Sequence, residues 1–181
     1  DLKTIERQGL LCKGVVENLL SFARASESGD DHCQLNLCVS EIVRVARHTL
    51  EMNVIELETV LGQDIPPARI DHRQLQQVLL NLVNNAAAAM PEGGRLRIET
   101  RRDPGARRAV IEIEDTGAGI DPAHLDRIFE PFFTTKPEGQ GTGLGLFVSY
   151  GIVTKNGGTI EAANRGEGTG ARFTVRLRIK D

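Results

Sequence analysis

The hydrophobic pattern at the start of the chain has the spacing of a helix that packs against other helices. Apolar or small residues recur in alternating steps of three and four, at Leu2, Ile5, Gly9, Cys12, Val16, Leu19 and Ala23. Several of these side chains are small for a two-stranded seam, so we expect a helical bundle completed by another helix or another chain. The alternative is that this helix lies on the domain that follows. The polar run SESGDDH at residues 26–32 ends the pattern and favours a linker.

Beyond the linker, short alternating runs and longer helical patterns follow one another. Strands are expected at 34–39, 54–62, 66–70, 95–101, 108–115, 158–165 and 171–179. Helices are expected at 40–52, 71–90 and 145–156, and residues 121–129 resemble one or two helical turns. Ser40 and Asp71 are candidate N-caps. Because strands and helices are mixed rather than strictly alternating, we expect an α/β two-layer sandwich with a mixed, largely antiparallel sheet and helices on one face, preceded by one bundle helix.

The composition fits one ordinary domain with an apolar core and a short appendage. The chain has 181 residues, of which 40% are apolar, and a formal net charge of -3. This small charge gives no global field that would draw nucleic acid or anionic lipid to the protein. No apolar run is long enough to span a membrane and no signal peptide opens the chain, so we expect a soluble, cytoplasmic segment without membrane contact.

The cysteines give no sign of a stabilising cross-link. Cys12, Cys33 and Cys38 are odd in number and form no C-x-x-C pair, so the sequence predicts neither a disulfide framework nor a zinc site. A reducing cytosol fits this usage best. His32 stands beside Cys33, but two adjacent ligand types without a second pair are far more often coincidence than a metal site.

A cluster of glycines precedes the last predicted helix. The stretch GQGTGLGLF, residues 139–147, has glycine at every second position over its first seven residues and then becomes apolar. Glycine costs roughly 0.5 to 1 kcal/mol relative to alanine in regular structure, so such a cluster marks backbone that bends sharply or approaches a ligand closely. The N-terminus of the following helix would suit a phosphate. Neither a P-loop nor a Rossmann motif is present, because no G-x-x-x-x-G-K-[ST] occurs and Val148 stands where G-x-G-x-x-G needs its last glycine.

Four short motifs stand in an order that identifies another nucleotide-binding family. They are NLVNNA at 81–86, DTGAG at 115–119, FEPFFTTK at 129–136 and GTGLGL at 141–146. In order and approximate spacing they resemble the N, G1, F and G2 boxes of sensor histidine kinases, within the ATPase group that includes the Hsp90 chaperone, DNA gyrase B and MutL. The resemblance covers residues 34–181 and implies a Bergerat-type ATP-binding fold. KGVVENLLSFAR further resembles the second helix of the dimerisation and phosphotransfer bundle of those kinases.

The resemblance implies that the chain has three parts. Residues 1–27 would be the second bundle helix, 28–33 a linker and 34–181 the catalytic domain, with an ATP lid at 116–142. A bundle helix without its partner favours a piece of a longer protein.

Two asparagines and one aspartate are the central site candidates. Asn81 and Asn85 lie four residues apart on one helical face, and an amide oxygen is a suitable neutral ligand for magnesium. By resemblance Asn85 is the magnesium ligand, with Asn81 beside it. Asp115 accepts hydrogen bonds only, so it can select adenine through its amino group, while Gly117 and Gly119 let the backbone approach the base. Turn chemistry alone would favour an Asx turn at Asp115, but its place among the four motifs favours nucleotide binding.

The remaining candidates lie in the predicted lid and at its end. Phe129, Phe132 and Phe133 are expected to dock on the sandwich and to anchor the lid. Lys136 could reach a phosphate, although a solvated lysine is nearly as common an outcome. The nucleotide-binding candidates of the last motif are Gly141, Thr142, Gly143, Leu144 and Gly145, whose glycines would form the rear hinge of the lid.

Two positions depart from the family pattern. Many members carry a basic residue three positions after the magnesium-ligand asparagine, where this chain has Ala88, and the NAAAAM form resembles the NtrB-like branch instead. Magnesium, backbone amides and Lys136 would then have to meet the phosphate charge. Ala171 stands where a threonine often lies near the adenine, so that contact is expected to be absent or mediated by water.

The resemblance implies a function that needs partners outside this chain. The domain would transfer the γ-phosphoryl group of Mg·ATP to a histidine on the missing bundle helix, for relay to an aspartate of a response regulator, in a parent that dimerises through the bundle. The alternative is a nucleotide-binding module without phosphotransfer, either a pseudokinase or an ATP-driven switch, and the intact motifs argue against it.

None of the four histidines has the context of a phosphoacceptor in the family. That histidine is followed directly by an acidic residue, whereas here the following residues are Cys33, Thr49, Arg73 and Leu125. The sequence therefore predicts that this chain holds only the donor half of the reaction.

Overall fold

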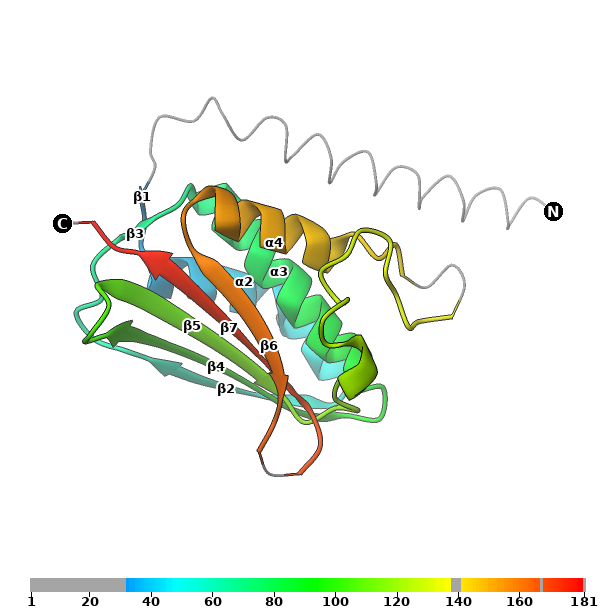
Figure 1. The fold of residues 1–181 in the computed structure, drawn as a ribbon. Helices are drawn as coiled ribbons and strands as arrows, with labels where there is room; N and C mark the ends of the chain where they lie inside the picture. The colour runs from blue at the N-terminus through cyan, green and yellow to red at the C-terminus, as the bar shows by residue number, and fades with distance from the viewer. Residues whose placement is uncertain (1–31, 138–140, 167, 181) are drawn as a thin grey trace, which may run out of the picture.

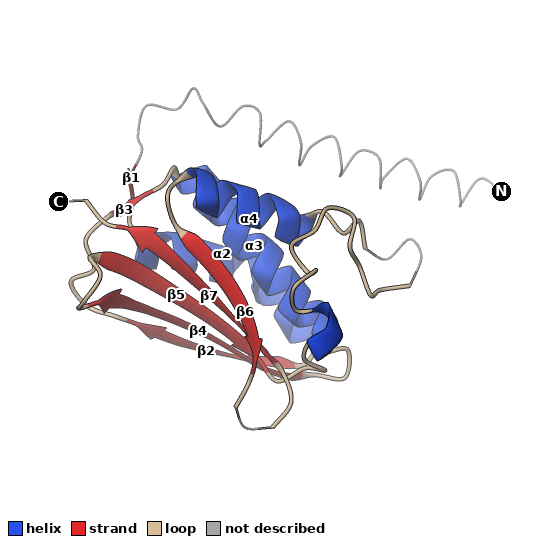
Figure 2. Cartoon of the chain, in the orientation of Figure 1, coloured by secondary structure: helices blue, strands red, loops and turns tan. Residues whose placement is uncertain are grey.

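The computed structural model describes residues 32–137, 141–166 and 168–180, which form a sheet covered on one face by helices. The strands are β1 (His32–Cys33), β2 (Ile55–Leu61), β3 (Ala68–Arg69), β4 (Gly94–Asp103), β5 (Arg108–Asp115), β6 (Thr159–Asn164) and β7 (Ala171–Arg178). The helices are α2 (Leu35–Met52), α3 (His72–Ala89), α4 (Gly145–Lys155) and the short 3-10 helix η1 (Pro122–His124). Figure 1 shows α2, α3 and α4 side by side, and Figure 2 shows them on the same side of the strands. The expected bundle helix 1–27 and most of the linker lie outside the described residues.

The main sheet is mixed and largely antiparallel, as the sequence predicts. Its strand order is β2-β4-β5-β7-β6. Only β2 and β4 run parallel, and the other three neighbouring pairs are antiparallel. With the helices on one face, the prediction of an α/β two-layer sandwich is confirmed. None of the described helices is long and apolar enough to cross a membrane.

The first helix begins earlier than its sequence suggests. The run QLNLCV was expected to be a strand, but Leu35 opens α2 and the predicted strand 34–39 is wrong. The reason is that Leu35, Cys38 and Val39 continue the helical spacing of the buried residues that follow, while Leu37 is 54% exposed. Ser40 therefore lies within the helix, where its hydroxyl donates a hydrogen bond to the Asn36 carbonyl instead of capping.

A two-stranded sheet closes one end of the domain. His32 and Cys33 pair antiparallel with Arg69 and Ala68, so two residues assigned to the linker belong to the folded domain. The predicted bend and short strand at 66–70 are confirmed by β3. Lys180 extends the connection, because its backbone N–H donates to the Pro67 carbonyl.

The central helix, α3, begins at the predicted cap. Asp71 Oδ1 accepts hydrogen bonds from the backbone N–H groups of Arg73 and Gln74, so the predicted N-cap is confirmed. The apolar face of α3 is fully buried, with Leu75, Val78, Leu79, Leu82 and Val83 at 2% exposure or less. α3 lies between α2 and α4 (Figure 1). The buried face of α3 therefore fixes the direction in which Asn81 and Asn85 point from the rest of the helix.

Candidate nucleotide site

The motifs of the sequence converge where β5 ends, α3 ends and α4 begins. Asp115 is the last residue of β5, and the chain after it lies against the end of α3 through a hydrogen bond from Ala118 N to Ala89 O at 3.2 Å. The first turn of α4 is held to α3 by Asn81, whose Nδ2 donates to the Gly145 carbonyl at 3.1 Å. Residues separated by more than sixty positions in the sequence thus form one site.

Asp115 presents a buried carboxylate with one oxygen already bonded. It is 3% exposed, and Oδ1 accepts from Gly117 N at 2.8 Å and from Ala171 N at 3.3 Å. The Asx turn that turn chemistry favours is therefore formed, yet it uses only Oδ1. Oδ2 has no hydrogen-bond partner in the described part of the chain and is available as an acceptor. Burial raises the pKa of Asp115, and the two backbone hydrogen bonds oppose that rise.

Gly117 is required by close packing against α3. A Cβ at this position would lie 2.4 Å from the Ala89 carbonyl oxygen, so only glycine lets the loop approach α3 this closely. Gly119 has a φ of 76°, in the left-handed region that favours glycine. The Asn164 side chain then holds the loop, because Oδ1 accepts from Ile120 N at 2.7 Å and Nδ2 donates to Ile120 O at 2.6 Å. Sequence reasoning missed this anchor, since an asparagine at the end of a strand gives no specific signal.

The two predicted asparagines of α3 have different surroundings. Asn81 Nδ2 donates to the Gly145 carbonyl and to Ser149 Oγ, at 3.1 and 3.2 Å, so this amide joins α3 to α4. Asn85 is half-buried, and its amide has no hydrogen-bond partner among the residues that the structure describes. Asn81 therefore holds α4 against α3, whereas the Asn85 amide has no such contact in the described part of the chain.

Replacing Asn81 by alanine should lower both stability and nucleotide affinity. Two hydrogen bonds would be lost at the α3–α4 contact, so we expect the free energy of unfolding to fall by about 1 to 2 kcal/mol. Urea denaturation followed by circular dichroism measures the change. The exposed neighbour Asn84 provides the matched control, and equal stability of Asn81→Ala and Asn84→Ala would show that the amide does not hold α4.

The N-terminus of α4 has the features of an anion-binding helix end. Thr142 Oγ1 accepts from Leu144 N at 3.3 Å, and Leu144 is 2% exposed. The first intrahelical bond runs from Val148 N to Leu144 O, so the preceding N–H groups of this turn have no partner within the helix. Gly143 has a φ of 66°, and a Cβ there would meet the Phe132 carbonyl carbon at 2.3 Å. Gly143 thus lets the chain just before α4 pack tightly against the backbone of Phe132.

The three phenylalanines of the predicted lid do not share one role. Phe129 is half-buried and contacts Tyr150, with ring centroids 5.4 Å apart, and Phe133 packs edge-on against His124 at 5.3 Å. Both pack against the core, as an anchor should. Phe132 is 70% exposed with a φ of 66°, so its expected docking on the sandwich is not observed. Its backbone N–H instead donates to the Gly143 carbonyl, because the tight return of the lid fixes this turn and directs the ring outward.

Lys136 lies beside the glycine run rather than in open solvent. A Cβ on Gly141 would lie 3.3 Å from Lys136 Cδ, which places the lysine stem against this loop. The side chain is half-buried, and burial lowers the pKa of its ammonium group. A partly desolvated cation beside this glycine run is suited to a phosphate group.

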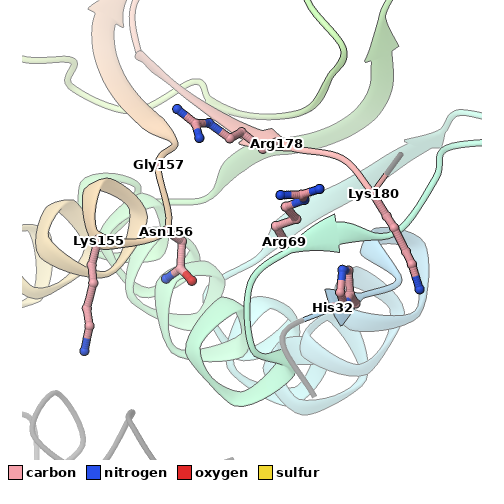
Figure 3. A pocket seen from close by; sticks show the side chains of 7 residues that line it. All are labelled: His32, Arg69, Lys155, Asn156, Gly157, Arg178 and Lys180. Carbon is pink, nitrogen blue, oxygen red and sulfur yellow. The ribbon is translucent and has the colours of Figure 1, made fainter. Parts of the chain in front are cut away.

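A basic hollow lies at the C-terminal end of α4. It has a volume of about 740 Å³ and is lined by His32, Arg69, Lys155, Asn156, Gly157, Arg178 and Lys180. Figure 3 shows basic side chains from β3, α4 and the end of the chain around it. It contains none of the predicted nucleotide-binding residues. The eleven residues of α4 put about 16 Å between its two ends.

Comparisons with known proteins show the family of the chain. A family model described as "Histidine kinase-, DNA gyrase B-, and HSP90-like ATPase" matches residues 70–181. Sensor kinase CckA of Brucella abortus is 38% identical over 190 residues, which cover 98% of this chain and 20% of that protein. The signal transduction histidine-protein kinase AtoS of Escherichia coli K12 is 37% identical over 165 residues, covering 91% of this chain and 26% of that protein. The chain thus spans about a fifth to a quarter of these relatives.

Solved structures give the same result. Full-length ShkA, in complex with AMPPNP, superposes with a TM-score of 0.79 at 26% identity, over 94% of this chain and 36% of that one. The nucleotide-free catalytic domain of histidine kinase ThkA superposes with a TM-score of 0.69 at 28% identity, over 81% of this chain and 95% of that one.

The chain belongs to the histidine kinase-, DNA gyrase B- and HSP90-like ATPase family. Within that family its relatives and structural neighbours are sensor histidine kinases, so residues 32–180 have the fold of a histidine kinase ATP-binding catalytic domain.

Proposed function

We propose that this domain binds Mg·ATP at the end of β5 and delivers its γ-phosphoryl group to a histidine on a bundle helix that is not part of this chain. The observation that carries the proposal is the buried Asp115, which keeps Oδ2 available beside the loop that Gly117 packs against α3. The same edge of the domain holds Asn85 and the N-terminus of α4. Adenine, metal and phosphate binding groups thus lie on three adjoining elements.

Asp115 and Gly117 would bind the adenine end. The free carboxylate oxygen accepts a hydrogen bond from the adenine amino group, and it would repel the oxygen that guanine presents at the same position. Since Gly117 has no side chain, the base can lie against the backbone of this loop. Burial of Asp115 strengthens the discrimination, because a mismatched polar group would find no water to compensate it.

Asn85 and the start of α4 would bind the phosphate end. An amide oxygen without a hydrogen-bond partner is a suitable magnesium ligand, and one or two such protein oxygens suffice beside the phosphates. Magnesium, when bound, neutralises charge that develops during transfer. Since Ala88 offers no cation, the N–H groups of the first turn of α4 and the ammonium group of Lys136 supply the remaining positive charge.

The segment 116–142 would act as the lid over the nucleotide. Asn164 fixes its beginning, Phe129 and Phe133 anchor its middle on the domain, and Gly143 forms its rear hinge. Closure of such a segment excludes water and completes the phosphate site. Thr142 and Leu144 set the geometry of the helix end that the lid leads into.

The complete reaction would need partners outside this chain. By analogy with the named relatives, the parent protein would dimerise through a helical bundle, phosphorylate a histidine there and pass the group to an aspartate of a response regulator. We place this activity in the cytoplasm, without nucleic acid or membrane contact from this segment. The assignment to an NtrB-like branch rests on the NAAAAM motif.

We expect this chain to bind ATP without phosphorylating itself. None of its histidines is followed by an acidic residue, and the described environment of each differs from a bundle helix: His32 lies in β1, His48 on α2, His72 at the start of α3 and His124 in η1. Incubation with Mg·ATP followed by intact-mass measurement should show no added phosphate. Acid-labile phosphate on any of the four histidines would contradict this expectation.

The direct test of the proposed function supplies the missing acceptor. A histidine-bearing bundle from a relative, mixed with this chain and γ-labelled ATP, should acquire label that is labile to acid and stable to base. The same mixture with Asn85→Ala should acquire almost none. ATP binding without any transfer would instead favour a nucleotide-binding module that works as a conformational switch.

A further inference from the structure

A group of sulfur and nitrogen ligands lies at the end of the domain opposite the candidate nucleotide site. The ligand atoms of Cys33, Cys38 and His72 all lie within 4.8 Å of one another. The cysteines are buried, at 1% and 0% exposure, and neither forms a disulfide. The sequence predicts no zinc site, because its three cysteines are odd in number and form no C-x-x-C pair, whereas the ligand residues found here come from β1, α2 and α3.

The spacing of these atoms suits a tetrahedral metal ion. Cys33 Sγ lies 3.3 Å from His72 Nδ1. With zinc–sulfur and zinc–nitrogen distances of about 2.3 and 2.0 Å, the sulfur and nitrogen ligands of a tetrahedral zinc ion lie about 3.5 Å apart. Only a small adjustment of these side chains would therefore admit the ion between them.

The histidine is already oriented as a metal ligand would be. His72 Nε2 lies 2.6 Å from Glu41 Oε2, and Gln76 Nε2 donates to the same oxygen at 2.8 Å. A carboxylate that accepts from the far ring nitrogen keeps the proton there and turns the near nitrogen, Nδ1, toward the metal. Glu41 is thus a positioning residue for His72, itself fixed by Gln76.

We propose that Cys33, Cys38 and His72 bind one zinc ion, with Glu41 holding the imidazole in place. The three side chains are the protein ligands, and a water molecule takes the fourth position. On binding, both cysteines become thiolates and the imidazole is neutral at Nδ1, so the protons that these groups carry leave to solvent. The side chains of His72 and Glu41 are about one-third exposed, at 35% and 31%, and the ion would enter past them.

A zinc ion at this position would link three elements of the fold. The ion would tie β1, α2 and α3 together at the end where the linker enters the domain, and it would hold the first residue of α3. Asn85 lies thirteen residues further along α3, about 20 Å away. Zinc and Mg·ATP should therefore bind independently, and failure of one site would leave the other testable.

Metal analysis of the chain with defined variants tests the proposal. The reduced protein, dialysed against zinc and then buffer, should retain one zinc per chain by elemental mass spectrometry. Cobalt in place of zinc should give a thiolate charge-transfer band in the near ultraviolet. Cys33→Ser, Cys38→Ser and His72→Ala should each lose the bound zinc, whereas the matched controls Cys12→Ser and His48→Ala should retain it.

A milder variant separates ligand loss from misfolding. Glu41→Gln leaves all three ligands in place, and we expect it to bind zinc about 10- to 100-fold more weakly with unchanged stoichiometry. Each variant should keep the circular dichroism spectrum of the native chain. Zinc retention by the ligand variants would overturn the proposal. So would a reduced native chain that binds no zinc.

Discussion

Replacing Asp115 by asparagine should abolish adenine recognition while leaving the domain folded. Asparagine can keep the hydrogen bonds that Oδ1 accepts from Gly117 and Ala171, because its carbonyl oxygen can take the same place. The amide nitrogen of the new side chain would then take the place of Oδ2. Its N–H group would face the N–H group of the adenine amino group, and two donors cannot form a hydrogen bond. We expect a loss of affinity of about 100-fold or more, measured by calorimetry with Mg·ATP.

The same substitution should not destabilise the empty domain. Burial raises the folded-state pKa of Asp115 above its unfolded value. Protonated Asp115 therefore stabilises the folded domain. This contribution to the free energy of unfolding is complete below the pKa of Asp115 in the unfolded chain, and it is lost as the pH rises through its pKa in the folded domain. At neutral pH the buried charge is therefore a cost that asparagine removes, so the melting temperature of Asp115→Asn should equal or exceed that of the native chain.

The exposed Asp64 provides the control for this pair of effects. Asp64 has a φ of 53°, which asparagine tolerates, and it lies in the loop between β2 and β3. Asp64→Asn should change neither affinity nor melting temperature. If Asp115→Asn bound Mg·ATP with native affinity, Asp115 would not be a nucleotide-binding residue. A large drop in the melting temperature of this variant would show that the carboxylate has a structural role instead.

Replacing Asn85 by alanine should remove phosphoryl transfer almost completely. Asn85 is the half-buried amide of α3 without a hydrogen-bond partner among the described residues, so its loss should cost little stability. If it binds magnesium, the variant should bind ATP no better with magnesium than with a chelator present. We expect transfer to a supplied histidine-bearing bundle to slow by about 100-fold or more, because positioning of the metal contributes several kcal/mol to such reactions.

Asn84 makes this a closely matched comparison. It precedes Asn85 on the same helix and is exposed, so Asn84→Ala should transfer at the native rate and keep the magnesium dependence. If Asn84→Ala and Asn85→Ala lost transfer equally, the effect would come from α3 as a whole. Unchanged magnesium dependence in Asn85→Ala would contradict its assignment as the metal ligand.

The sequence predicted the architecture because its strands and helices carry clear periodic patterns. The caps and hairpins of β4, β5 and α3 follow from local chemistry, and the glycines of the site stand where close packing or a positive φ requires them. The run QLNLCV misled because three alternating positions cannot distinguish a strand from the first turn of a helix. The burial of Leu35, Cys38 and Val39 on the same face as the later buried residues of α2 decides between them.

The site was predicted less completely than the fold. Four motifs single out Asp115 and Asn85 as candidates, but a motif does not say which oxygen is free or which amide is already bonded. Asn81 matches the motif and yet joins two helices, and Phe132 belongs to the aromatic set and yet points outward. The cysteine–histidine group could not be predicted, because its members are brought together only by the packing of β1, α2 and α3.

Which end of the domain binds ATP is the most direct question to ask of this molecule. The basic hollow at the C-terminal end of α4 is the competing site, and amide NMR spectra during titration with Mg·AMP-PNP distinguish the two. The amides of Gly117, Gly119 and Gly145 should shift strongly, while those of Gly157 and Arg178 stay in place. Shifts concentrated at Gly157 and Arg178, with none at Gly117, would contradict the assignment of the Asp115 end as the nucleotide site.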